Sequence, residues 1–181
     1  MKEQYSVPNH SPKQMEAGST ERPKRRVSDS SLTASYHMMP QDANPQGNVY
    51  GGTIMKLMDA LAAAVAERHC RTNTVTASID RMDFFKPVYI GDLLNLKASV
   101  NYTGLTSLEI GVRIEAENLR TGNVAHTGSS YLTFVALDES GKPTPVPEII
   151  PQTQVEKRRY VEAEHRKEDR LASLKKEKSS K

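Results

Sequence analysis

The sequence has very little cysteine and no long apolar run, and each shortage excludes a class of protein. Cys70 is the single cysteine among 181 residues, so the chain can form neither an internal disulfide nor a cysteine metal cluster. It contains no stretch of 18 apolar residues and no apolar segment typical of a signal peptide. We therefore expect a protein of the reducing cytoplasm that is neither secreted nor embedded in a membrane.

Positive charge is scarce in the middle of the chain. The net charge of +3 arises from the two ends, because residues 31–153 hold nine basic against twelve acidic residues. Nucleic-acid-binding domains usually carry their positive charge on a folded face. The charge distribution therefore argues against a nucleic-acid partner.

Composition divides the chain into three regions. Residues 1–30 have almost no aliphatic side chains and are rich in proline, serine and charge, which predicts a disordered tail. Residues 31–150 are long enough to form one domain with a core. Residues 151–181 follow a proline-rich connector, which we expect to be extended, and predict a charged helix with a thin apolar stripe. That helix is interpreted as solvated and lightly packed; alternatively, it helps to hold an anionic ligand or a neighbouring subunit.

Alternation of apolar and polar residues predicts an antiparallel sheet. A first strand is expected at 31–39, and period-two alternation marks four more segments: 74–85, 94–102, 107–118 and 124–137. Short turns separate these segments, so one face of the sheet is expected to be covered. A helix at 51–69 is apolar nearly all round and has to be enclosed. We therefore predict an α+β fold in which a curved antiparallel sheet of five or more strands wraps a long central helix.

Two glycines, Gly51 and Gly52, open this helix although glycine is a poor helix former. The first turn of a helix has unpaired N–H groups and the positive end of the dipole, and glycine lets a ligand approach them. Such amides suit an oxygen on which negative charge develops, as in acyl transfer. A tight turn ahead of a packed helix explains the pair equally well, so both interpretations stay open.

Two further polar residues lie near these glycines. Asp59 is the only acid between residues 53 and 66, and a carboxylate in apolar surroundings tends to have a pKa raised toward that of a general base. It could instead be satisfied by a nearby backbone group or arginine, or face solvent beside Lys56. Asn44 lies in the loop before the helix; taken alone, it is better explained as a turn residue ahead of Pro45 or as an N-cap-like residue.

The spacing of the whole set is specific. Asn44, Gly47, Gly51, Gly52, Met55 and Asp59 follow the pattern N-x-x-G-x-x-x-G-G-x-x-M-x-x-x-D, and ASIDRMDFFKP at 77–87 with Gly91-Asp92 continues the match. This pattern resembles the hot-dog-fold acyl-CoA thioesterases, in particular the bacterial acyl-CoA hydrolases and the cytosolic brain-type hydrolase. The resemblance covers about residues 31–150.

The resemblance implies hydrolysis of fatty acyl-CoA to free fatty acid and CoA, with no metal and no cofactor, since CoA is part of the substrate. Asn44 would position the thioester or water, the N–H of Gly51 or Gly52 would polarise the carbonyl, and Asp59 would act as general base or nucleophile. Candidates to bind the substrate lie in the same region: Ser78, Arg81, Phe84, Lys86, Thr106 and Ser107, with Lys56 as a further cation. The resemblance also implies a homo-oligomer, a hexamer built as a trimer of dimers.

Helix geometry adds a constraint of its own. Gly52 and Asp59 are seven residues apart, which is roughly 10 Å along a helix axis. One carbonyl carbon cannot lie within about 3 Å of both. If both take part, they are expected to come from different subunits whose helices lie side by side in antiparallel fashion.

Two other functions are possible for such a chain. A dehydratase of the same fold would need a histidine near the helix start, and residues 44–47 offer none. A non-catalytic acyl-CoA-binding regulator remains the alternative, although it would usually bring a helix-turn-helix, for which residues 1–30 are too polar. His37, His69 and His126 lack metal-ligand spacing and are interpreted as structural.

Overall fold

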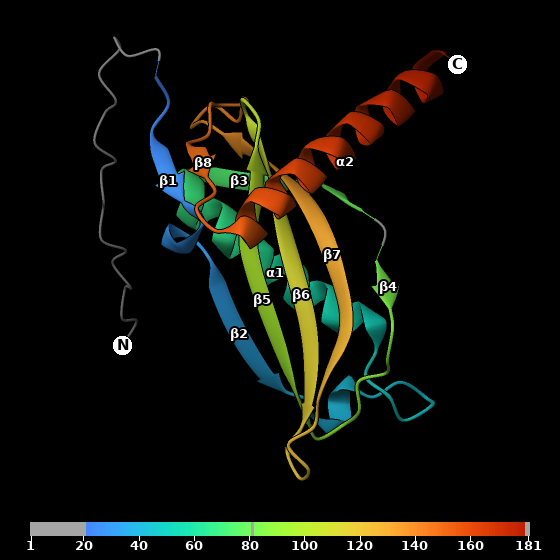
Figure 1. The fold of residues 1–181 in the computed structure, drawn as a ribbon. Helices are drawn as coiled ribbons and strands as arrows, with labels where there is room; N and C mark the ends of the chain where they lie inside the picture. Colours follow the sequence, from blue (N-terminus) through green and yellow to red (C-terminus); the bar gives the residue numbers. More distant parts are fainter. Residues whose placement is uncertain (1–20, 81, 180–181) are drawn as a thin grey trace, which may run out of the picture.

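The computed structural model describes residues 21–80 and 82–179. Its main sheet is antiparallel, with the strand order β2-β5-β6-β7-β3, and a short strand β4 pairs with β7. The strands are β2 (Leu32–His37), β3 (Asn73–Ile79), β4 (Asp83–Phe84), β5 (Asp92–Thr103), β6 (Ser107–Asn118) and β7 (Val124–Leu137). The predicted α+β arrangement of a long helix wrapped by a curved antiparallel sheet is confirmed (Figure 1).

The long helix α1 (Gly51–Cys70) lies against one face of the sheet, behind β5 and β6 in Figure 1. Its inward side chains are buried: Ile54, Met58, Leu61, Ala62, Val65, Ala66 and His69. They meet alternate residues of the long strands, such as Leu96, Ile110 and Phe134, none of which is exposed. The opposite side of α1 is open in the protomer, where Met55, Ala60 and Ala64 are exposed.

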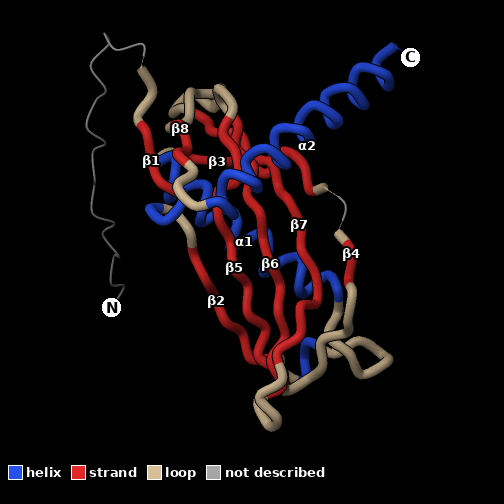
Figure 2. The backbone as a smooth tube through the Cα atoms, in the orientation of Figure 1, coloured by secondary structure: helices blue, strands red, loops and turns tan. Residues whose placement is uncertain are grey.

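A second helix, α2 (Gln154–Ser179), crosses the other face of the sheet, in front of β5, β6 and β7 in Figure 1. It packs more firmly than its thin apolar stripe predicts, because it docks through polar contacts. Ala163 is fully buried, and Arg166 forms an ion pair with Glu109, whose side chain is 2% exposed. Figure 2 shows the resulting order of layers: helix, sheet, helix.

The predicted disordered tail is wrong for residues 24–30. Strand β1 (Lys24–Arg26) pairs in parallel with β8 (Glu148–Ile150), a strand within the proline-rich connector. The 3₁₀ turn η1 (Val27–Asp29) follows and buries Val27. Composition missed this segment because one aliphatic residue and edge pairing suffice to hold it. Residues 1–20 lie outside the described part of the chain.

The strand predicted at 74–85 is interrupted. Ile79 pairs with Leu132 of β7 and Asp83 with Ser129, so the pairing with β7 is interrupted between β3 and β4. The segment that joins these two strands, which begins at Asp80, is called the corner. A further 3₁₀ turn, η2 (Pro40–Asp42), follows β2. In the described chain, no helix is long and apolar enough to cross a membrane.

Candidate active site

The start of α1 presents free backbone amides. The N–H groups of Thr53 and Ile54 already donate to the carbonyl of Tyr50, at 3.0 and 3.3 Å. Within the described residues, the N–H groups of Gly51 and Gly52 have no such acceptor. Neither glycine has a positive φ, whereas Gly47 in the preceding loop does, at 83°. The backbone conformation therefore does not require glycine at 51 and 52, which favours the interpretation that they expose the amides.

Asn44 organises the loop that leads into the helix. Its Oδ1 accepts the backbone N–H groups of Gln46 and Asn48, at 2.9 and 3.1 Å, and its own N–H donates to the Asn48 carbonyl. The side chain thus closes a turn, as the simpler interpretation expected. Its Nδ2 amide donates to no other described residue, so it is free to bind a ligand.

A pocket of about 280 Å³ joins these groups. Asn44, Gly51 and Ile54 line one side of it, and Phe84 and Lys86 of the segment after β3 line the other. A Cβ atom at Gly51 would lie 3.4 Å from the Phe84 ring, whereas one at Gly52 would meet nothing within 4 Å. The structure therefore brings together Asn44, Gly51, Phe84 and Lys86, whereas Gly52 does not line this pocket.

Asp59 lies two turns further along α1, on the half-open side of the helix. Its Oδ1 accepts a hydrogen bond of 2.9 Å from the hydroxyl of Thr76 on β3. Strand β3 is an edge of the sheet, and Thr76 is itself exposed. The acid and its threonine therefore lie at an open edge of the sheet, next to the uncovered side of α1.

The remaining candidates are not brought to the helix start within one protomer. Ser78 pairs with Thr133, across from Glu109, on the face of the sheet that α2 covers. Thr106 in the turn after β5 and Ser107 at the start of β6 lie at the far end of β5. The twelve residues of β5 extend roughly 40 Å from the end near the Asn44 loop. Lys56 is exposed on α1, and Arg81 lies outside the described residues.

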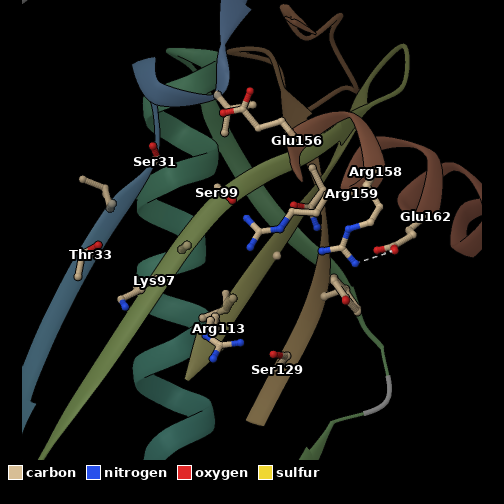
Figure 3. A pocket seen from close by; sticks show the side chains of 17 residues that line it. Ser31, Thr33, Lys97, Ser99, Arg113, Ser129, Glu156, Arg158, Arg159 and Glu162 are labelled. Carbon is tan, nitrogen blue, oxygen red and sulfur yellow. Dashed lines mark hydrogen bonds and ion pairs between the residues drawn. The ribbon is translucent and has the colours of Figure 1, made fainter. Parts of the chain in front are cut away.

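A larger pocket of about 450 Å³ lies on the α2 side of the sheet (Figure 3). Four of its lining residues are basic: Lys97, Arg113, Arg158 and Arg159. Lys97 and Arg113 donate to Glu115, at 2.6 and 2.7 Å, and hold the pKa of its carboxyl below the usual range. Among the described residues, none of the predicted site residues lines this pocket, and no group of three His, Cys, Asp or Glu side chains is placed to hold a metal ion.

Comparison with known proteins identifies the class of this fold and site. The profile of the thioesterase superfamily matches residues 46–123. An uncharacterised acyl-CoA thioester hydrolase of Bacillus subtilis is 40% identical over 132 residues, covering 73% of this chain and 77% of that protein. The crystal structure of an apo-hexameric acyl-CoA thioesterase superposes with a TM-score of 0.82 at 42% identity, over 84% of this chain and 97% of that one.

The acyl-CoA hydrolase of Staphylococcus aureus, solved with butyryl-CoA, CoA and CoA disulfide, has a TM-score of 0.82 and 39% identity, over 87% of this chain and 96% of its own. Fold and matches together define a hydrolase of the thioesterase class. Within that class, the chain belongs to the family of hot-dog-fold acyl-CoA thioesterases.

Thr76, which donates a hydrogen bond to Asp59, is a candidate site residue that sequence reasoning missed. The S. aureus enzyme has also been solved with an asparagine, an aspartate or a threonine replaced by alanine. In that enzyme, fifteen positions separate the asparagine from the aspartate and seventeen separate the aspartate from the threonine. Asn44, Asp59 and Thr76 have the same two spacings. Threonine is common in strands, so only the contact with Asp59 distinguishes this one.

Proposed function

We propose that this protein hydrolyses fatty acyl-CoA thioesters, with Asn44, Asp59, Thr76 and the Gly51-Gly52 amides as its catalytic groups. The observation that carries the proposal is the hydrogen bond from Thr76 to Asp59. It holds a carboxylate in a fixed orientation on a mostly apolar stretch of α1. The equal spacing of asparagine, aspartate and threonine in the S. aureus hydrolase supports the same assignment.

Each group has a defined part in the reaction. The N–H of Gly51 or Gly52 donates to the thioester oxygen and stabilises the negative charge that develops there. Asn44 orients the thioester or the attacking water with its free amide. Asp59 takes a proton from that water, whose oxygen bonds to the carbonyl carbon; the carbon–sulfur bond then breaks, and the CoA thiolate leaves and takes up a proton. In the alternative route, Asp59 attacks directly and water cleaves the resulting anhydride.

The complete site is proposed to form between two protomers. The pocket at the helix start and Asp59 are separated by roughly 10 Å along α1, so one thioester cannot reach both in a single protomer. The open side of α1 and the exposed edge strand β3 offer the surface on which a second copy would place its own helix. A hexamer built from three such dimers agrees with the hexameric assembly of a similar thioesterase.

Substrate recognition is assigned to the walls of the pocket at the helix start. Phe84, Phe85 and Pro87 provide apolar surface for the acyl or pantetheine chain, and Lys86 provides positive charge for a CoA phosphate. Lys56 and Arg81 remain further candidates for the phosphates. Thr106, Ser107 and Ser78 would contact CoA only if a neighbouring subunit brought them to this pocket.

Release of the CoA thiol from acyl-CoA by the purified protein tests the proposal. Asp59→Asn keeps the size of the side chain but removes the base, so hydrolysis is expected to fall by about 100-fold or more. Binding of butyryl-CoA should remain measurable in this variant, which shows that the site still folds. Rates from acetyl-CoA to palmitoyl-CoA then give the chain-length preference. Binding of acyl-CoA without turnover by the wild-type protein would instead identify a regulator.

A further inference from the structure

Helix α2 contacts the outer face of the sheet through basic side chains. Arg166 donates to both oxygens of Glu109, at 2.7 and 3.2 Å, and Asn101 donates to the same carboxylate at 3.2 Å. The Arg166 guanidinium also stacks on the ring of Tyr131, 3.6 Å from its centroid. Because Glu109 is 2% exposed, a bidentate contact of this kind fixes where α2 lies on the sheet.

One turn further along α2, Arg170 binds a carboxylate outside the central strands. Its Nη1 donates to both oxygens of Asp80, at 3.0 and 2.8 Å, and each side chain of the pair is 22% exposed. The backbone N–H of Asp80 donates to the carbonyl of Tyr131 at 2.9 Å. Asp80 is thus held on two sides, by α2 through its side chain and by β7 through its backbone.

Asp80 occupies the corner between β3 and β4. Four residues before it, Thr76 holds Asp59. Four residues after it, Phe84 packs against Gly51, and Lys86 lines the pocket with Asn44. The corner therefore sets the placement of both halves of the proposed site, although Arg170 itself touches neither of them.

We propose that Arg170 is a positioning residue for the thioester site: by holding both oxygens of Asp80, it fixes the corner from which Thr76 and Phe84 extend. The inference rests on the proposed function for what the two halves do. Ion pairs that are partly exposed contribute little to overall stability. Small displacements of catalytic groups, in contrast, reduce rates strongly. Removal of Arg170 is therefore expected to lower the rate of hydrolysis and to leave the thermal stability nearly unchanged.

Four variants of the full chain test this role. Arg170→Met and Asp80→Asn each remove the pair, and the double exchange Arg170→Asp with Asp80→Arg restores it in reverse. Arg158→Met is the matched control, because it removes an arginine of α2 whose ion pair with Glu162 lies within the helix and is exposed. Measurements are kcat and KM on the acyl-CoA that the wild type turns over best, the Tm, the oligomeric state, and amide hydrogen exchange across 76–87.

Arg170→Met and Asp80→Asn are expected to lower kcat/KM by roughly 10- to 100-fold, with kcat reduced and KM raised together, since Thr76 serves chemistry and Phe84 and Lys86 serve binding. Exchange across 76–87 should accelerate, and the double exchange should recover part of the loss. The control should stay within about twofold of the wild type. If the role of Arg170 were purely structural, kcat would fall at constant KM, and Tm would fall or the oligomer would dissociate at the same time. That pattern would overturn the inference.

Equal kinetics and equal exchange in Arg170→Met, Asp80→Asn and the control would also overturn it. The exchange measurement separates this inference from the proposed function. If the wild type hydrolyses no acyl-CoA, the proposed function fails, while faster exchange in Arg170→Met but not in Arg158→Met still supports the positioning of the corner. If Asp59→Asn abolishes hydrolysis and Arg170→Met changes nothing, only the positioning role fails.

Discussion

At the scale of single residues, the proposed role of the pair Gly51-Gly52 would favour chemistry at a helix start over helix stability. Glycine is the least favourable ordinary residue in a helix, and neither position needs it for its backbone angles. What the missing side chains provide is access to two amides without acceptors in the described chain. The backbone angles and the open amides therefore favour a site for a developing negative charge over a tight turn, and this role stays a prediction.

Gly52→Ala tests this trade-off. A Cβ atom at position 52 meets nothing within 4 Å, and alanine is favoured over glycine in helices by up to about 1 kcal/mol. The free energy of unfolding is expected to stay equal or rise, whereas kcat/KM falls by about tenfold or more because a methyl group stands beside the amide. Urea unfolding and thiol release on the same preparation measure both quantities. Undiminished kcat/KM would remove Gly52 from the site.

Thr76→Val tests the contact that carries the proposed function. Valine has the shape of threonine but cannot donate the 2.9 Å hydrogen bond to Asp59. Small displacements of a catalytic group reduce rates strongly, so we expect a loss of roughly 10- to 100-fold in kcat; Tm should change little because this hydrogen bond is exposed. Thr74→Val is the matched control, because the Thr74 hydroxyl lies on the same strand and lacks a partner among the described residues. Equal kinetics in the two variants would contradict the role of Thr76.

At the scale of elements, a buried histidine joins three segments that are distant in sequence. His69 lies in the last turn of α1. Its Nδ1 accepts a hydrogen bond of 3.3 Å from the Ser30 hydroxyl, and its Nε2 donates to the carbonyl of Pro147 at 3.0 Å. A carbonyl can only accept, which places the proton of the neutral ring on Nε2. The end of α1, the 3₁₀ turn η1 and the proline-rich connector are thereby held together, as a structural interpretation of His69 expects.

This network predicts a pH dependence of stability. Burial is the main cause that lowers the pKa of His69 below its usual value of 6.5. Below that value the unfolded chain binds a proton that the folded chain does not, so stability is complete above about pH 6.5 and declines as the pH falls. The slope from this group is at most about 1.4 kcal/mol per pH unit. Urea unfolding at pH 7.5 and 5.5 measures it; His69→Gln should lose this slope, and the exposed His37→Gln should keep it.

At the scale of the whole molecule, the site is proposed to need two chains. The helix start and Asp59 are on one continuous helix, yet they are too far apart to serve one thioester. A dimer with antiparallel α1 helices would create two sites, each with the Asn44 loop of one protomer and the Asp59–Thr76 pair of the other. The exposed apolar residues of α1 and β3 would then be covered.

Complementation between inactive variants tests this assembly. Asn44→Ala and Asp59→Ala are each expected to be inactive alone. In a mixed dimer, one site carries both changes and the other carries neither, so random mixing restores about a quarter of the wild-type activity for an isologous twofold dimer. Co-expression with two affinity tags isolates the mixed species. Mixed dimers without any activity would show that each protomer forms its own site.

The sequence by itself determined the long helix, the antiparallel strands and the positions of Asn44, the two glycines and Asp59. Alternation and helical periodicity depend only on near neighbours along the chain, so they can be read directly. Sequence could not place β1 and β8, the corner at Asp80, the docking of α2 on Glu109, or the hydrogen bond from Thr76 to Asp59. Each of these joins residues far apart in sequence, where no local pattern marks the partner. Tertiary structure alone decided them, because hydrogen bonding and burial between distant segments depend on where the sheet and its two helices bring the chain together.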